Sequence, residues 1–274
     1  MSLSFFSRQT LFYVKKYLFI VSFICMKESQ WAKIAKNYEI ERDSVSPAHF
    51  LLDDLVVSRA VVRKNIKILD YGAGSGTISR LMCVMGGLVR AYEPMKEMHE
   101  LLLKNSNPKK FVGLKILDSH SDIMKAGKFD AAVCINVLNH IKDAPAIIKL
   151  MSKVLKKGGK LIISIPHPIK NLGAWKVKRI NGGLVFDFYR LNNYMEEGRS
   201  LKPRVDINGR LVAASVVINH RRISTYLRWL LESGFVISDF IEPMPAKKDA
   251  KRFPLFYSKS SKIPYFLVLE CVKK

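Results

Sequence analysis

Three acidic residues in the first half of the chain each follow an apolar run. Asp70, Glu93 and Asp118 stand at the ends of the runs 66–69, 88–92 and 115–117. Buried parallel strands read as such runs, and open α/β sheets bind their ligands beyond the carboxyl ends of the strands. We therefore expect these carboxylates at a ligand-binding edge, where they can accept hydrogen bonds from hydroxyl or amino groups.

A glycine-rich turn links the first of these acids to a predicted helix. Residues 70–77 read Asp-Tyr-Gly-Ala-Gly-Ser-Gly-Thr, with glycine at every second position from 72 to 76. Glycine is needed where φ is positive or where a Cβ would collide with a ligand. The spacing differs from the G-x-G-x-x-G of dinucleotide-binding loops, and no Lys-Ser/Thr pair follows as in phosphate-binding loops. The pattern predicts a nucleoside ligand without a pyrophosphate, with Glu93, 23 residues after Asp70, placed for its ribose hydroxyls.

The elements that must position these residues alternate between strands and helices. A helix is expected over 143–156, where apolar residues recur at 147, 150, 151 and 154 before the pair Gly158-Gly159. Further strands are expected at 129–135, 160–165, 235–241 and 264–271, with another helix opening at His220 and ending at Ser233-Gly234. This order predicts an α/β fold with one sheet in a single domain that carries additions.

Five segments, taken in order, resemble the class I S-adenosylmethionine-dependent methyltransferases, and bacterial small-molecule methyltransferases in particular. They are D-Y-G-A-G-S-G at 70–76, A-Y-E-P at 91–94, L-D-S at 117–119, F-D-A-A-V-C-I-N-V-L-N-H-I at 129–141 and L-K-K-G-G-K-L-I-I-S at 155–164. Less specific likenesses are P-H-P at 166–168, Y-M-E-E-G-R at 194–199 and H-R-R-I-S-T-Y-L-R-W-L-L-E-S-G-F at 220–235. The resemblance implies a Rossmann-like seven-stranded sheet with helices on both faces and an antiparallel last strand. It also implies S-adenosylmethionine as cofactor and S-adenosylhomocysteine as product.

The resemblance further implies a role for each matching residue. The ribose hydroxyls would bind to Glu93, and the adenine edge to Asp118 and the amide of Ser119. Residues expected at the amino acid end of the cofactor are Asp70, Gly72, Ala73, Gly74 and Gly76. Residues expected beside the adenine ring or the sulfonium are Pro94, Met95, Asn136 and Val137. Two alternatives stand beside these roles: Asp118 as a cap of the turn that follows it, and Met95 as ordinary helix packing.

The N-terminal part divides at Met26. Residues 1–25 form an apolar and basic extension whose uninterrupted apolar run is too short to span a bilayer. We expect an upstream extension that need not belong to the native start, with an interfacial membrane helix as the alternative. Residues 26–64 are predicted to form a helical cap, in which the segment around Tyr38 resembles the helix that folds over the cofactor in many small-molecule methyltransferases.

The second half predicts where the acceptor binds. The cofactor core is expected to span 65–167, and residues 168–219 form an insertion rich in Gly, Asn and aromatic residues. Short strands at 182–188, 202–207 and 211–218 would make a small β-ribbon lid, and residues 220–274 would complete the sheet. Because His167 and His220 flank this insertion, they are the candidate bases for removing an acceptor proton. The alternatives are that His167 serves turn geometry and that His220 caps the following helix.

The charge distribution bears on the partner. The chain has a formal net charge of +23, and residues 151–274 alone carry 24 basic and 9 acidic side chains. Such an excess attracts nucleic acid, an anionic small molecule or an anionic membrane surface. The segment Cys134-Ile135-Asn136-Val137 lacks the Asn/Asp-Pro-Pro-aromatic motif of amino-methylating nucleic-acid enzymes, and no RNA-binding module is recognisable.

The favoured reading is therefore an enzyme that moves a methyl group to an oxygen or nitrogen atom of a small-molecule acceptor by in-line attack. The alternatives are a tRNA or rRNA methyltransferase and a non-catalytic S-adenosylmethionine-binding partner protein. The four scattered cysteines, with no C-x-x-C, predict buried thiols in a reducing compartment and no metal site. We expect a cytoplasmic protein without an integral membrane span, with peripheral membrane association through residues 1–25 as the alternative.

Overall fold

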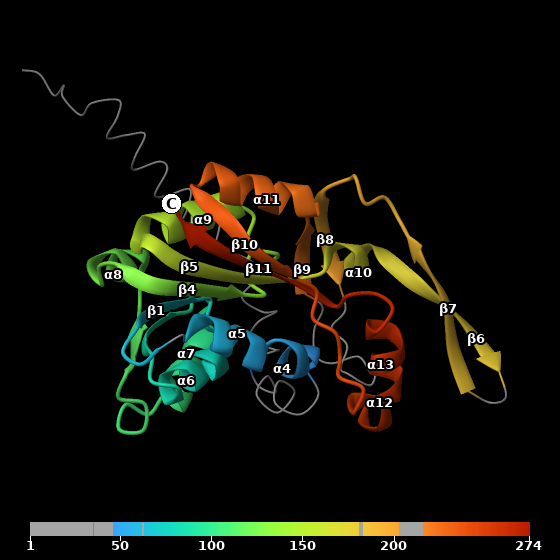
Figure 1. Cartoon of the computed structure of the whole chain (residues 1–274), viewed down its shortest axis with the longest axis horizontal. Coiled ribbons are helices and arrows are strands. Elements are labelled where there is room, and N and C mark those ends of the chain that lie inside the picture. Colours follow the sequence, from blue (N-terminus) through green and yellow to red (C-terminus); the bar gives the residue numbers. More distant parts are fainter. Residues whose placement is uncertain (1–34, 36–45, 62, 181–182, 203–215) are drawn as a thin grey trace, which may run out of the picture.

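The computed structural model describes residues 35, 46–61, 63–180, 183–202 and 216–274. Its centre is a seven-stranded sheet with the order β10-β11-β5-β4-β1-β2-β3 (Figure 1). The strands are β1 (Lys67–Tyr71), β2 (Leu88–Tyr92), β3 (Leu114–Leu117), β4 (Phe129–Ile135), β5 (Leu155–Pro166), β10 (Phe235–Ile241) and β11 (Phe266–Lys273). The predicted seven-stranded sheet is confirmed.

Strand directions explain where a ligand can bind. Strand β1 pairs in parallel with both β2 and β4, so the chain winds outward in opposite directions from this point. The crevice at such a reversal of strand order is the usual ligand site of open α/β sheets. Strand β11 is antiparallel to both β5 and β10, as expected for the last strand.

Helices cover both faces of the sheet and bury two apolar cores (Figure 1). One core contains residues of α5 (Asp53–Ala60), α6 (Thr77–Val84) and α7 (Lys96–Asn105), together with α13 (Pro254–Ser260). The other contains residues of α8 (His120–Lys125), α9 (Ala144–Val154) and α11 (Ile223–Glu232). Two short helices, α4 (Pro47–Leu51) and α12 (Asp249–Arg252), lie next to α5 and α13.

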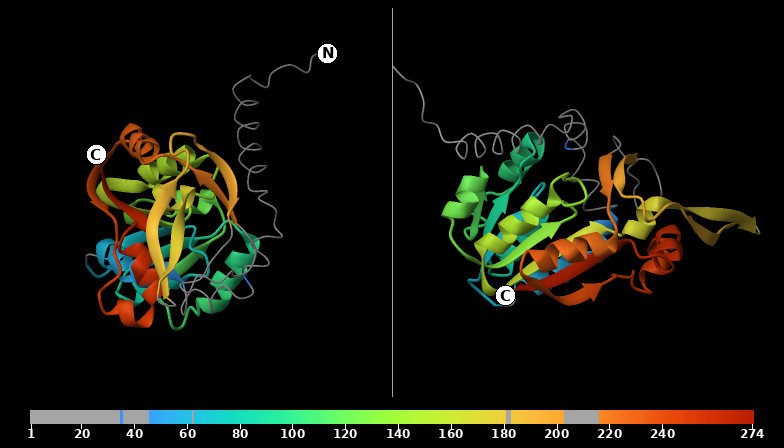
Figure 2. Two further views of the ribbon diagram at one scale, coloured as in Figure 1. Left: turned by 90° about the vertical axis from the view of Figure 1, so that its right-hand side faces the viewer. Right: turned by 90° about the horizontal axis from the view of Figure 1, so that it is seen from above.

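The insertion after β5 differs from the prediction in where its strands begin and end. It opens with α10 (Pro168–Leu172) and a hairpin of β6 (Gly173–Ile180) and β7 (Gly183–Leu191), which projects from the body of the molecule (Figures 1 and 2). A second antiparallel pair joins β8 (Gly198–Lys202) to β9 (Val216–His220). The expectation of a helix opening at His220 was wrong. His220 ends β9 because it pairs with Gly198, and α11 begins three residues later with Arg222 as its N-cap.

Some predicted features lie outside the described residues or stay predictions. Tyr38, the extension 1–25 and most of the strand expected at 202–207 belong to the parts of the chain that the structure does not describe. The division into an N-terminal cap, a cofactor core and a substrate-binding insertion stays a prediction. Within the described ranges, no helix is long and apolar enough to cross a membrane.

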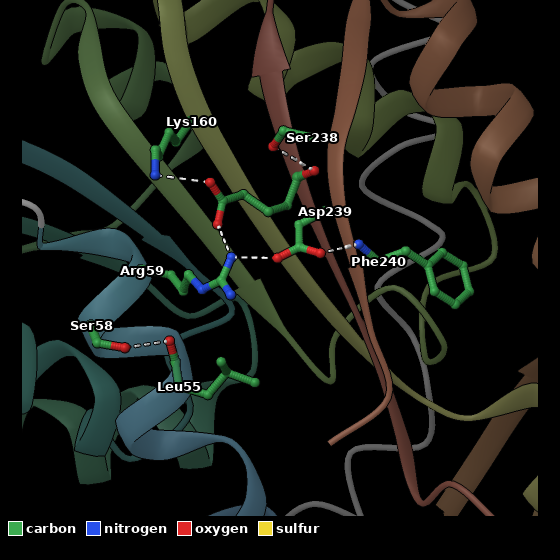
Figure 3. A network of polar contacts seen from close by, with 8 residues as sticks. Leu55, Ser58, Arg59, Lys160, Ser238, Asp239 and Phe240 are labelled. Atoms are coloured by element: carbon green, nitrogen blue, oxygen red, sulfur yellow. Dashed lines mark hydrogen bonds and ion pairs between the residues drawn. The ribbon is translucent and has the colours of Figure 1, made fainter. Parts of the chain in front are cut away.

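A network of charged side chains connects α5 to strands β5, β10 and β11 of the sheet (Figure 3). The Arg59 guanidinium donates to Asp239 Oδ2 at 2.6 Å and to Glu270 Oε2 at 2.9 Å, while Lys160 Nζ lies 2.8 Å from Glu270 Oε1. Burial alone would raise the pKa of Glu270, but the hydrogen bonds from Lys160 and Arg59 outweigh it and hold the pKa below its usual value. The ionised carboxylate therefore stabilises the contact between α5 and strands β5, β10 and β11.

We expect the substitution Glu270→Gln to lower the free energy of unfolding by about 2 kcal/mol, because it leaves two cations around a neutral, largely buried side chain. Urea denaturation at pH 7 measures this loss. Since the folded-state pKa is lowered, the contribution is present above the unfolded value near 4.5 and is lost as the pH falls through the folded value. The exposed pair of Lys178 with Asp187 supplies the control, and Asp187→Asn should leave the urea midpoint unchanged. Equal losses in both variants would contradict a special role for Glu270.

Candidate functional site

The glycine loop at 72–76 brings the ends of β1 and β4 together. Gly72, Gly74 and Gly76 all have positive φ, at 75°, 58° and 87°. A Cβ on Gly72 would stand 2.3 Å from Val137 Cγ2, and one on Gly76 would stand 2.5 Å from Leu102 Cδ1. The loop is thus a tight backbone cradle whose only side chains are those of Ala73 and Ser75, and Val137, the residue that follows Asn136, closes it on one side. Such a cradle lets a ligand approach the backbone closely.

Asp70 is buried at the end of β1 and holds α6. Its Oδ2 accepts a hydrogen bond of 2.5 Å from the Ser79 hydroxyl in the first turns of that helix. Burial raises the pKa of Asp70 to about 6, despite the opposing effect of this hydrogen bond. The carboxyl group therefore fixes the path of the chain on both sides of the glycine loop.

Glu93 joins the glycine loop to the end of β2. Its Oε2 accepts from the Gly74 amide at 2.8 Å, and its Oε1 accepts from the Met95 amide at 2.9 Å. The residue is 8% exposed, and burial raises the pKa of Glu93 to about 7 against the lowering effect of both backbone hydrogen bonds. Each carboxylate oxygen can accept a further hydrogen bond, so this buried group suits a ligand that offers two hydroxyl donors.

At the end of β3 the two predicted residues differ in their surroundings. The Asp118 side chain is 82% exposed, with its Oδ1 3.4 Å from His99 Nε2. Ser119 is the N-cap of α8, because its hydroxyl oxygen accepts from the Asp122 amide and its proton is donated to the Asp122 carboxylate at 2.6 Å. The cap of this helix is therefore Ser119, and the carboxylate of Asp118 stays open to solvent and ligands.

Sequence reasoning did not single out an aromatic cluster beneath this edge. His120 Nε2 lies 2.9 Å from the Tyr71 hydroxyl, and the rings of His120, Tyr71 and Tyr92 all contact one another, with centroid separations of 5.2 to 5.7 Å. Burial lowers the pKa of His120, which favours the neutral form of the imidazole. The sequence did hold a signal for this cluster. Tyr71 and Tyr92 are each next to a site acid, Asp70 and Glu93, so both tyrosines are expected on the face of the sheet opposite to these acids.

The loop after β4 carries Asn136 in a left-handed conformation, with φ of 56°. Its backbone amide donates to Ser164 O at 2.9 Å, and the Ser164 hydroxyl donates to Asn136 Oδ1 at 3.3 Å. Val137, the next residue, is the one that closes the cradle at Gly72. The carboxyl ends of β1, β4 and β5 thus meet at Asn136.

The two histidines occupy different surroundings. His167 is fully buried, its Nδ1 accepts from the Ile169 amide at 3.3 Å, and its Nε2 lies 2.9 Å from Glu242 Oε1. Burial lowers the pKa of His167 more than the neighbouring Glu242 raises it. His220 is 7% exposed, with Nε2 2.9 Å from the Tyr194 carbonyl oxygen and Nδ1 buried without a partner.

The last strand of the insertion is fastened to the loop after β4. The backbone amide of Asn219 donates to Asn139 O at 2.7 Å, and His140 Nδ1 lies 2.7 Å from Val217 O. The buried guanidinium of Arg221 donates to three carbonyl oxygens of the same loop, those of Leu138, Ile141 and Lys142, at 2.6 to 2.9 Å. The end of β9 therefore lies beside the proposed ligand crevice.

The geometry brings together most of the predicted ligand-binding residues, namely Asp70, Gly72, Ala73, Gly74, Gly76, Glu93, Pro94, Met95, Asn136 and Val137, at the ends of β1, β2 and β4. A family model described as a methyltransferase domain matches residues 48–201, which is more than half of the chain. The chain belongs to the class I S-adenosylmethionine-dependent methyltransferases. It is an enzyme of that family, and S-adenosylmethionine is the family's methyl donor.

Relatives and solved structures agree with this membership. The chain is 32% identical over 113 residues to a ubiquinone biosynthesis O-methyltransferase of Xanthomonas axonopodis pv. citri. The aligned region covers 39% of this chain and 46% of that protein. The match thus spans just under half of the relative. A similar fold is seen in an S-adenosylmethionine-dependent methyltransferase from Mesorhizobium loti, with a TM-score of 0.59, 23% identity, and coverage of 77% of this chain and 92% of that one. A structure described as a putative S-adenosylmethionine-dependent methyltransferase from Listeria monocytogenes has a TM-score of 0.61, 22% identity, and coverage of 77% of this chain and 91% of that one.

The residues present fit the donor. The glycine loop carries only the small side chains of Ala73 and Ser75, and the buried Glu93 carboxylate beside it retains unused acceptor capacity. No group of three or more His, Cys, Asp or Glu residues that could hold a metal ion occurs within the described part of the chain.

Proposed function

We propose that this methyltransferase methylates an oxygen or nitrogen atom of a small molecule, with an oxygen favoured. The observation that carries the proposal is the attachment of β9 to the loop after β4, because this strand of the insertion stands beside the crevice on the side of β4 and β5. A crevice flanked in this way favours a small acceptor over a long polymer. The preference for oxygen rests on the relative from Xanthomonas axonopodis pv. citri, which is named as an O-methyltransferase.

The proposed donor site follows from the geometry described above. Glu93 would accept hydrogen bonds from the two ribose hydroxyls, and the exposed Asp118 with the Ser119 amide would read the adenine edge, next to Met95. The amino acid end would lie against the glycine loop and Asp70, and the sulfonium beside Asn136 and Val137. When bound, S-adenosylmethionine supplies an electrophilic methyl group, so these residues need mainly to align it with the acceptor atom for in-line attack.

His220 is the better supported candidate for moving the acceptor proton. The Tyr194 carbonyl can only accept, so Nε2 of His220 carries a hydrogen, and Nδ1 is the nitrogen that is left to accept a proton. That buried nitrogen has no partner and can take a proton from a hydroxyl or amine. Both nitrogens of His167 are already engaged, so its role in proton transfer stays a prediction, and we expect it mainly to position the end of β5.

We expect His220→Gln to lower kcat about 100-fold or more while the affinity for S-adenosylhomocysteine stays unchanged, since the base acts only on the acceptor. His167→Gln is the matched comparison, and its expected effect is on stability. If His167→Gln lowers kcat in this way and His220→Gln does not, the assignment is reversed.

The acceptor class is tested with S-adenosylmethionine carrying a labelled methyl group. Cell extract is divided into a fraction below about 3 kDa and total RNA, and each is incubated with the full-length enzyme. We expect label in the small-molecule fraction, with the product identified by mass spectrometry. Label in RNA alone, with binding that weakens steeply with salt, would support the alternative that the net charge of +23 suggests.

A further inference from the structure

Asn139 is buried with nothing bound to its side chain. The residue is 2% exposed, and neither Nδ2 nor Oδ1 of its carboxamide has a hydrogen-bond partner. Within the described residues, it is the only side chain with two buried polar atoms that both lack a partner. Buried polar groups are nearly always paired, so an orphaned carboxamide requires an explanation.

The backbone around Asn139 is held firmly. The Asn139 carbonyl oxygen accepts from the backbone amide of Asn219 at 2.7 Å and from its side-chain amide at 3.1 Å. Arg221 binds the carbonyl oxygens on either side, those of Leu138 and Ile141. The carboxamide is therefore left unpaired in a loop whose carbonyl oxygens at 137–139, 141 and 142 all accept hydrogen bonds, and loose local structure does not account for it.

The position of Asn139 lies between the donor and acceptor sides of the site. The His140 amide donates to Val137 O at 2.9 Å, which makes a tight turn after Asn136 and brings residues three apart toward the same side. Asn139 thus lies one turn beyond the proposed sulfonium position, and Asn219 of the insertion strand β9 donates to its carbonyl oxygen.

We propose that the Asn139 carboxamide binds the acceptor, through a neutral group that both donates and accepts hydrogen bonds. A carboxamide offers a donor and an acceptor, and a hydroxyl or a primary amide satisfies both, whereas a carboxylate only accepts and an ammonium only donates. The acceptor class is then a small molecule with a hydroxyl or amide group next to the atom that is methylated. This inference rests on the proposed function and names the chemistry of its substrate.

The first test needs no acceptor. A residue kept for binding leaves the ligand-free protein with an unpaired carboxamide, so Asn139→Leu, which is close in shape and apolar, should leave the Tm unchanged or raise it by up to about 4 °C. The control is Asn219→Leu, which removes the hydrogen bond to Asn139 O and should lower the Tm. A clear fall in Tm for Asn139→Leu would show a structural residue and overturn the proposal.

The second test measures methyl transfer to the acceptor in the small-molecule fraction that the wild-type enzyme labels. For Asn139→Leu we expect kcat/KM for the acceptor to fall at least 100-fold, while the Kd for S-adenosylhomocysteine, measured by calorimetry, stays within threefold of the wild-type value. Retained transfer, or equal losses of transfer and cofactor affinity, would overturn the proposal. If the wild-type enzyme labels RNA only, the proposed function fails, and the Tm comparison still decides whether Asn139 is a binding or a structural residue.

Discussion

Replacing Gly72 by alanine should weaken the binding of S-adenosylhomocysteine by about 100-fold, or about 2.7 kcal/mol. The added Cβ would stand 2.3 Å from Val137 Cγ2 and 2.9 Å from Val137 Cγ1, at a φ of +75° that disfavours any residue with a side chain. To relieve the contact, the loops after β1 and β4 must move apart, and these loops form the proposed floor of the donor site. Isothermal titration calorimetry measures the change.

Two further variants show which effect is responsible. All three of the nearest atoms belong to Val137, so the double variant with Gly72→Ala and Val137→Ala should recover part of the affinity, and the remaining defect reports the positive φ. Gly158 is the matched control, because its φ is +76° and a Cβ there meets nothing within 4 Å. Gly158→Ala should cost stability but leave the affinity unchanged. Tight binding by Gly72→Ala would show that the two loops need not touch.

The central strands were predictable because they are buried on both faces. The runs at 88–92 and 129–135 coincide with β2 and β4, and the acids and glycines after the first strands mark the crevice, whereas the run at 235–241 coincides with β10, an edge strand with one exposed face. A parallel strand reads as a continuous apolar run, and a loop that touches a ligand reads as glycine. These signals are local, so a single sequence is enough to read them.

The insertion was less predictable because its structure depends on distant partners. His220 looked like a helix start in sequence, yet it pairs with Gly198 and ends a strand. Nothing local to Arg221 predicts that its guanidinium binds carbonyl oxygens about 80 residues earlier in the chain. Likewise, Asn139 becomes distinctive only when burial shows that its carboxamide has no partner. Residues of this kind are recognised by contacts, which no local spacing encodes.

The largest expected effect on the donor site after that of Gly72 belongs to Glu93. We expect Glu93→Gln to weaken S-adenosylhomocysteine binding by about 100-fold, since hydrogen bonds from the ribose hydroxyls to a charged acceptor are each worth about 1.5 to 3 kcal/mol. In the wild-type protein the two carboxylate oxygens accept hydrogen bonds from the backbone amides of Gly74 and Met95. The glutamine side chain has one NH₂ group in place of an oxygen, so one of these backbone amides would face a donor and lose its hydrogen bond. The exposed Glu100 supplies the control, and Glu100→Gln should bind as the wild type does.

The pKa of Glu93 gives this prediction a pH signature. With a folded value of about 7 against 4.5 for the free side chain, Glu93 contributes stability to the ligand-free protein below pH 4.5 that is lost as the pH rises through 7, about 3 kcal/mol in all. Ligand binding has the opposite dependence. If the ribose hydroxyls bind the ionised carboxylate, affinity should rise up to tenfold per pH unit below 7 and level off above it. In Glu93→Gln both dependences should flatten. A wild-type affinity that does not change between pH 5.5 and 8.5 would mean that the ribose is bound elsewhere, and that Glu93 serves only to join the loop after β1 to the start of α7.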